Sequence, residues 1–191
     1  MFRTMNKETF KVLSIQEKLK EIIGKKVKRL FLVIWPPYGE ETTSQIDISA
    51  GYIFEEAPDK LLLITTDMDD LTTPMVKELP VPAQYFEWTA FESRMKRWMD
   101  CEEGMEMDTE YYEVSDVALF KGIVNQKVKA VELVYASTDA PIGIKLLFPN
   151  DFVLSTPIAD GNTIETQYFH QNQNLKYFKH WGAIEYISLK E

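Results

Sequence analysis

The strongest constraint on the fold of this chain is that one stretch of its sequence occurs twice. Residues 22–34 (IIGKKVKRLFLVI) resemble residues 122–135 (GIVNQKVKAVELVY), and each copy is followed by two further apolar runs and an acidic turn. A repeat of this length predicts two units with the same order of helices and strands. Each unit alone is small, so we expect the two to share one core.

Each copy is predicted to open with a helix. Ser14 and Glu17 have the spacing of a capping box, which predicts a helix that begins at Ser14. Gly24 is suited to end it, because glycine enters the left-handed conformation without steric cost. Asn125 occupies the equivalent position and is the next best residue there, so a second helix is predicted from Ser115 to this point.

Strands are predicted after both helices. Residues 27–35 and 128–135 are rich in β-branched and aromatic side chains. Residues 46–54 begin with a clean alternation of apolar and polar positions, which indicates a strand with one buried face. Residues 142–148 and 152–156 flank a Pro-Asn-Asp turn, which predicts a tight hairpin.

The sequence therefore predicts an α+β fold. We expect duplicated helix–strand–strand–strand units that form a mainly antiparallel sheet, or two facing sheets, with the helices on one side. The whole chain, 1–191, is predicted to be a single domain of two pseudo-symmetric halves. Its expected parts are repeat one (14–75), a connecting helix and acidic linker (76–114), repeat two (115–170) and a C-terminal strand (171–191).

Two features lie outside the main match between the copies. One is an apolar stripe at helical spacing, which predicts a helix packed on the core; it consists of Trp88, Phe91, Met95, Trp98 and Met99. The other is the triplet Gln84-Tyr85-Phe86, which recurs as residues 167–169. Three residues are too few to extend the repeat by themselves.

Several classes of function leave no mark on this sequence. No glycine loop for phosphate, no GxSxG and no HExxH is found. Two histidines, His170 and His180, are few for a metal site, and Cys101 lies among acids rather than the electropositive surroundings of catalytic thiolates. We expect no cofactor and no metal, and the balance favours a non-enzymatic protein.

Charge and cysteine content narrow the choice of partner and compartment. The formal net charge of −9 argues against a nucleic-acid partner, since like charges repel. No apolar run is long enough to cross a membrane, and the N-terminus lacks the features of a secretory signal. Cys101 is the only cysteine, which fits a reducing compartment, so a cytoplasmic protein without a membrane partner is expected.

The leading functional hypothesis comes from residues 100–116, which contain eight acidic residues and no basic one. Such a segment can steer a basic protein partner into contact, whereas the simpler interpretation is a solvated linker. Small acidic proteins without catalytic residues are common among bacterial immunity proteins, although no motif here matches such a family. The candidate docking residues, with two tyrosines as expected exposed anchors, are Glu102, Glu103, Glu106, Asp108, Glu110, Tyr111 and Tyr112.

A second hypothesis places an enzyme at the interface of the two copies. An acidic turn follows the third strand of each copy, and clustered carboxylates can bind a divalent cation or act as an acid/base pair. The alternative is that these residues only reverse the chain by bonding nearby backbone amides. The candidate carboxylates are Asp67, Asp69, Asp70 and Asp160, and the test is whether Asp69 and Asp160 converge.

Overall fold

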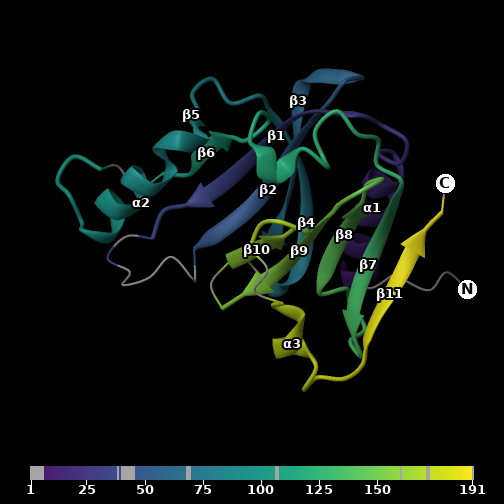
Figure 1. Cartoon of the computed structure of the whole chain (residues 1–191). Helices are drawn as coiled ribbons and strands as arrows, with labels where there is room; N and C mark the ends of the chain where they lie inside the picture. Colours follow the sequence, from purple (N-terminus) through teal and green to yellow (C-terminus); the bar gives the residue numbers. More distant parts are fainter. Residues whose placement is uncertain are drawn as a thin grey trace, which may run out of the picture.

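The fold consists of two mainly antiparallel sheets with short helices around them (Figure 1). The structure is a computed structural model, and it describes residues 7–37, 39, 46–67, 70–105, 108–159, 161–170 and 173–190. The predicted α+β class is confirmed, with two sheets rather than one. No helix among the described residues combines the length and apolarity that crossing a membrane requires.

Sheet one has six strands in the order β4-β3-β2-β1-β6-β5. All neighbours in it are antiparallel except β5 and β6, which pair in parallel. Its strands are β1 (Val27–Trp35), β2 (Asp47–Phe54), β3 (Ala57–Asp67), β4 (Asp70–Pro80), β5 (Phe86–Glu87) and β6 (Glu110–Glu113). The fourth strand, β4, was not predicted as a separate element; it returns from the acidic turn to pair along β3.

Sheet two has five strands in the order β10-β9-β8-β7-β11, all antiparallel. They are β7 (Ala130–Ala136), β8 (Gly143–Leu147), β9 (Phe152–Ile158), β10 (Gly161–Glu165) and β11 (Ile184–Leu189). The predicted hairpin between β8 and β9 is confirmed, and it is closed by the Phe148 amide, which donates to the Asp151 carbonyl at 2.9 Å. Within residues 171–191, expected as a C-terminal strand, the strand is β11, and a helical turn at Leu175–Phe178 precedes it.

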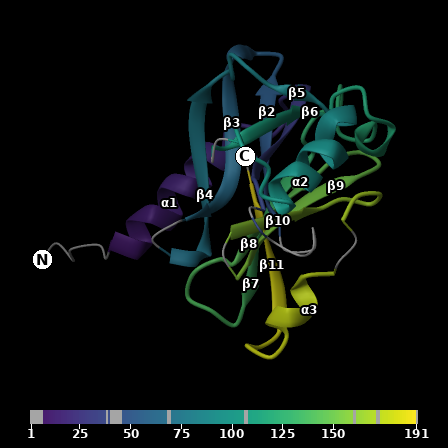
Figure 2. The same ribbon diagram turned by 90° about the vertical axis from the view of Figure 1, so that its left-hand side faces the viewer.

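The helices differ from the prediction at their starts. Helix α1 spans Lys7–Lys20 and lies beside β4 (Figure 2), so the expected start at Ser14 is wrong, and Ser14 lies inside the helix. The second predicted helix is only a single 3₁₀ turn, η3 (Ala118–Phe120). The apolar stripe does form a helix, α2 (Phe91–Met99), preceded by the 3₁₀ turn η2 (Trp88–Ala90). Helix α3 (Leu175–Phe178) is a single turn.

The main core lies between the inner faces of the two sheets. The alternating residues of β2 and its flank all belong to it, as predicted; they are Ile46, Ile48, Ala50, Tyr52 and Phe54. Helix α1 contributes Ile15 and Leu19, and α2 contributes Met95 and Trp98. A smaller apolar cluster around Phe31 lies on the outer face of sheet one, and another around Phe178 lies on the outer face of sheet two.

Backbone hydrogen bonds join the two sheets directly. They connect residues 24–27, which lead into β1, with residues 125–128, which precede β7. The Gly24 amide donates to the Val128 carbonyl at 2.8 Å, and the Asn125 amide donates to the Val27 carbonyl at 2.8 Å. Two further backbone bonds connect the same segments: the Val27 amide donates to the Gln126 carbonyl, and the Val128 amide donates to the Lys25 carbonyl, both at 3.0 Å. Gly24 and Asn125 both have positive φ, 84° and 62°. The predicted left-handed positions are thus confirmed in both copies.

Candidate functional site

The acidic segment is mounted on the connection between α2 and β6. Asp100, Glu102, Glu103 and Asp108 are exposed along it. Its first residues continue from α2 through backbone bonds, since the Glu102 amide donates to the Arg97 carbonyl at 3.0 Å. Met105, near its middle, is partly buried and packs against the main core. The exposed acids are therefore carried by backbone that is tied to the fold at several points.

Glu110 anchors the far end of this segment, and only 6% of its surface is exposed. It accepts hydrogen bonds from Arg94 through two guanidinium nitrogens, from Trp98 Nε1 at 3.0 Å and from the Tyr112 hydroxyl. We call these four residues the Glu110 cluster. Burial alone would raise the pKa of Glu110, but the hydrogen bonds from Arg94, Tyr112 and Trp98 outweigh burial and hold that pKa below its ordinary value.

Aromatic rings surround the Glu110 cluster. The Arg94 guanidinium lies 3.8 Å from the centroid of the Phe86 ring, and Phe86 lies 5.6 Å from Tyr112. Trp88 stacks on Phe91 at 4.4 Å. Stacked and edge-to-face rings of this kind favour one arrangement of the side chains over others. The base of the acidic segment is therefore well packed.

A second ion pair fixes the end of β6 to β1. Arg29 Nε and Nη2 donate to the two carboxylate oxygens of Glu113, both at 2.7 Å. The hydrogen bonds from Arg29 lower the pKa of Glu113, and the same pair raises the pKa of Arg29. The guanidinium also lies over the rings of Phe31 at 4.8 Å and Tyr85 at 5.2 Å. Glu113 is thus part of the framework and not of the outward-facing charge.

The predicted docking residues differ in how far they are exposed to solvent. Glu102, Glu103 and Asp108 are exposed, while Glu106 lies outside the described residues. The expectation that Tyr112 is an exposed anchor is wrong, because its ring is completely buried and its hydroxyl bonds Glu110. Glu110 is buried as well, because it accepts the hydrogen bonds of the Glu110 cluster. Tyr111 is half-buried and packs on the outer cluster of sheet one.

The second set of predicted carboxylates can be followed only in part. Asp67, at the end of β3, is buried and forms an ion pair with Lys11 of α1. Asp69 and Asp160 lie outside the described residues, and Asp70 begins β4 with its side chain outside them too. No group of three metal-ligating side chains occurs in the described part of the chain. The convergence of Asp69 and Asp160 therefore stays a prediction.

Asn162 marks a polar junction between the sheets that sequence reasoning missed. Its side-chain oxygen accepts from Thr66 at 3.0 Å and Ser155 at 2.9 Å, and its amide nitrogen donates to the Ile48 carbonyl at 2.8 Å. Its backbone amide donates to Asp47 at 2.9 Å. Burial raises the pKa of Asp47, and the bond from Asn162 opposes that rise. In the sequence, Asn162 has the appearance of an ordinary turn residue.

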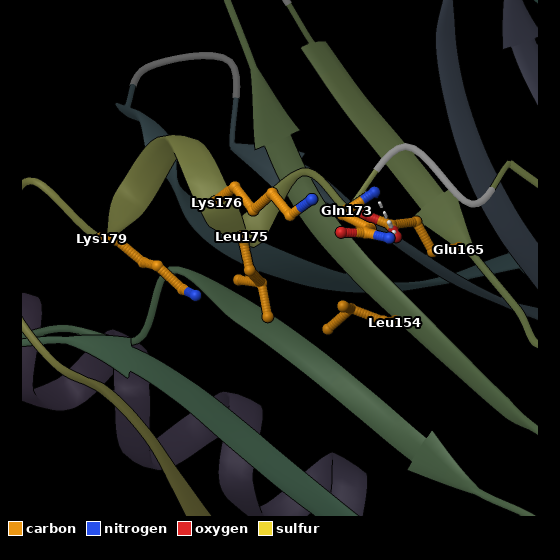
Figure 3. Close-up of a pocket in the computed structure, with 6 residues that line it drawn as sticks. All are labelled: Leu154, Glu165, Gln173, Leu175, Lys176 and Lys179. Carbon is orange, nitrogen blue, oxygen red and sulfur yellow. Dashed lines mark hydrogen bonds between the residues drawn. The ribbon is translucent and has the colours of Figure 1, made fainter.

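A hollow of about 240 Å³ lies between α3 and sheet two (Figure 3). Leu154 and Leu175 provide its apolar lining, with Lys176 and Lys179 beside them (Figure 3). Glu165 also lines it, but its two oxygens accept from the backbone amides of Gln173 and Asn174 at 2.9 and 2.7 Å. This carboxylate holds the start of α3 in place, so its arrangement is structural.

Comparisons with models of known protein families, with curated proteins and with solved structures found no match to this chain.

Proposed function

We propose that this protein is a non-enzymatic binding module that docks a basic protein partner on its acidic segment, residues 100–116. The observation that carries the proposal is the exposure of Asp100, Glu102, Glu103 and Asp108 on backbone held between α2 and the Glu110 cluster. The backbone amides of Asp100 and Glu102 are bonded to carbonyls of α2, which keeps the spacing of these acids, so the partner's cations meet a preformed pattern there. A solvated linker needs no such anchoring.

The charge of this surface is only partly neutralised within the described residues. Glu102 pairs with Arg97 at 2.7 Å, and both side chains are more than two-fifths exposed. A pair exposed to this extent contributes little to stability, so either partner can be given up to a docking protein. Asp100 and Glu103 form no ion pair with a described residue. The segment therefore presents net negative charge to an approaching basic surface.

We also propose that the two halves of the chain are copies of one unit, which serves as the scaffold for this surface. The support is the shared order of the first four strands in both sheets and the reciprocal bonds that link Gly24 and Asn125 to the opposite copy. The single cysteine fits a reducing compartment, so we place the protein in the cytoplasm. Its general character is that of a bacterial immunity protein.

The decisive experiment compares two variants with the same change in charge. In the first, four of the exposed acids of the segment, Asp100, Glu102, Glu103 and Asp108, are replaced by serine, and the exposed Asp116 is left in place. In the matched control, four exposed acids elsewhere are replaced instead: Glu55, Glu56, Asp59 and Asp139. Both variants lose the same formal charge, so non-specific attraction falls equally in the two.

Wild-type and variant proteins are immobilised, challenged with extract of the native host, and washed at low and high salt. We expect wild type and the control to retain the same basic protein, and the segment variant to lose it. The affinity for that purified protein should weaken with salt, because exposed charges are screened. A retained protein that the segment variant binds as tightly as wild type, or an affinity insensitive to salt, would contradict the proposal.

A further inference from the structure

The four edges of the two sheets are not equally protected. The β4 edge lies beside α1, and Lys18 of that helix donates to the Val76 carbonyl at 3.3 Å. All five residues of β10 are buried, and β10 lies against β2. In sheet one, β5 covers β6 as a short additional strand. An uncovered edge offers unpaired backbone amides and carbonyls to any strand that approaches it.

Strand β11 forms such an uncovered edge. It pairs with β7 on one side and has no other strand beside it in the described part of the chain. Residues 185–188 are exposed without interruption, which means that the sheet's edge is open there as well as its faces. The pairing with β7 shows no bulge, and the sequence IEYISL contains neither proline nor lysine. Of the usual devices that discourage edge pairing, β11 has one charged residue, Glu185, and helix α1 also lies near it, but its four middle residues stay exposed.

The two sheets differ in whether a further strand covers the strand next to their first one. Both place the strand that follows their last helix next to their first strand: β6 beside β1, and β11 beside β7. In sheet one the first triplet copy leads into β5, where Phe86 pairs with Tyr112. In sheet two, Phe169 of the second triplet is instead buried in the main core, 5.2 Å from Phe120. Among the described residues, no strand therefore covers β11 as β5 covers β6.

We propose that β11 is a homodimerisation edge, which pairs antiparallel with β11 of a second copy of this chain across a two-fold axis. The charges favour this occupant. Glu185 is the only charged residue in the strand, and an axis at Tyr186 places it opposite Ile187 of the second copy. An axis at Ile187 places it opposite Leu189, so the two glutamates do not face each other in either case.

The surroundings of β11 are close to neutral although the chain is strongly acidic. Lys145 lies over the Tyr186 ring at 5.2 Å, and Glu132 also faces this ring. Glu165 acts on this tyrosine as well, so with Lys190 and Glu185 the nearby charges are two positive and three negative. The acidic segment lies on the opposite side of the molecule, since α2 and β11 are at opposite ends of the view in Figure 1. Two copies can therefore approach at β11 without bringing their acidic segments together.

The expected dimer is weak. Pairing along six residues buries much less surface than the roughly 1,600 Å² of a standard interface, so we expect a Kd in the micromolar range or above. Exposed aromatic residues near the strand, Tyr186 at 45% and Trp181 at 42%, add apolar contact. The proposal is independent of the partner proposed for the acidic segment, because each can fail while the other holds.

The test is sedimentation velocity of the full chain from about 10 μM to about 1 mM, the range in which a weak dimer dissociates. We expect concentration-dependent dimerisation for wild type. Ile187→Lys places like charges near the axis and should raise the Kd by at least about tenfold. The matched control is Leu119→Lys, which adds the same charge at another exposed aliphatic residue and should leave the Kd unchanged.

Hydrogen exchange on wild type gives a second readout that does not depend on a variant folding. Amides of residues 184–189 should exchange more slowly at high protein concentration, while those of β6 should not change. A protein that stays monomeric over the whole range would overturn the proposal. So would a dimer that shows no concentration-dependent protection in β11, or one that a folded Ile187→Lys protein forms as tightly as wild type.

Discussion

The replacement Glu110→Gln tests whether the Glu110 cluster holds the base of the acidic segment. The carboxylate accepts from Arg94, Trp98 and Tyr112, and only 6% of the residue is exposed. Glutamine has nearly the same shape but lacks the charge, and one of its terminal atoms is a donor. It therefore leaves the Arg94 charge uncompensated. Its terminal NH₂ group also faces Arg94, Trp98 and Tyr112, which are themselves donors and cannot accept from it in their present arrangement.

The expected change in the free energy of unfolding follows from the ion pair and the hydrogen bonds that Glu110→Gln removes. Breaking a fully buried ion pair costs about 3–5 kcal/mol, and a hydrogen bond to a charged group contributes about 1.5–3 kcal/mol. Arg94 keeps 22% of its side chain exposed, so water offsets part of the loss. We expect Glu110→Gln to lower the free energy of unfolding by about 3 kcal/mol at neutral pH, a large share of a typical domain's stability.

The assay is urea unfolding followed by circular dichroism, at neutral pH and at several lower values. The folded-state pKa of Glu110 lies below its ordinary value, so its stabilisation is complete at neutral pH. That stabilisation disappears as the carboxyl group takes up a proton in the folded protein. The difference between wild type and Glu110→Gln should therefore shrink on acidification.

The matched control is Glu102→Gln, in the same segment but in an exposed ion pair with Arg97. This replacement should change the free energy of unfolding by no more than about 0.5 kcal/mol. The reasoning is refuted if Glu110→Gln is as mild as the control at neutral pH. A difference from wild type that persists undiminished at low pH would also refute it.

Three further changes address the rest of the core. Asn162→Ala should cost about 3 kcal/mol in urea unfolding because it leaves buried polar groups of both sheets without partners, whereas the exposed Asn150→Ala should cost less than about 0.5 kcal/mol. Gly161→Ala should cost about 2 kcal/mol or more, since its Cβ would lie 2.4 Å from Asp47 Cγ. Burial lowers the pKa of His170, so the unfolded chain binds its proton more readily and acidification through about pH 6.5 should destabilise the fold. His170→Gln should remove that component, and an NMR titration should place the His170 pKa below 6.5.

Local chemistry explains what the sequence predicted well. The left-handed residues Gly24 and Asn125 were predictable because few residue types tolerate positive φ. The face of β2 that points into the main core was predictable because alternation along a strand fixes which side chains share a face, but the expectation of a single buried face was wrong, since both faces of β2 are buried. Both signals depend only on neighbours in the chain.

The helix starts were not predictable because distant contacts decide them. Helix α1 continues upstream of Ser14 to Lys7, so the capping-box spacing there has no end to cap. Just before the second copy, residues 110–113 of the linker pair with β1 of sheet one as β6. The Val114 amide then donates to the Leu30 carbonyl at 2.9 Å, which keeps the chain extended up to the point where a longer helix would need to begin.

Distant contacts also decide which acids of the acidic segment face solvent, and the sequence alone did not predict this. In sequence its acids form one group, yet Glu110 and Glu113 are neutralised by Arg94 and Arg29 from other elements. Burial alternates along residues 110–113, but the sequence Glu-Tyr-Tyr-Glu does not, so no local pattern indicated that Glu110 and Tyr112 would share the buried face. Since the paired acids contribute little outward field, the proposed steering of a partner rests on the exposed acids alone. At about 0.1 M salt their attraction reaches only about 10 Å, so a partner must present its cations directly opposite them.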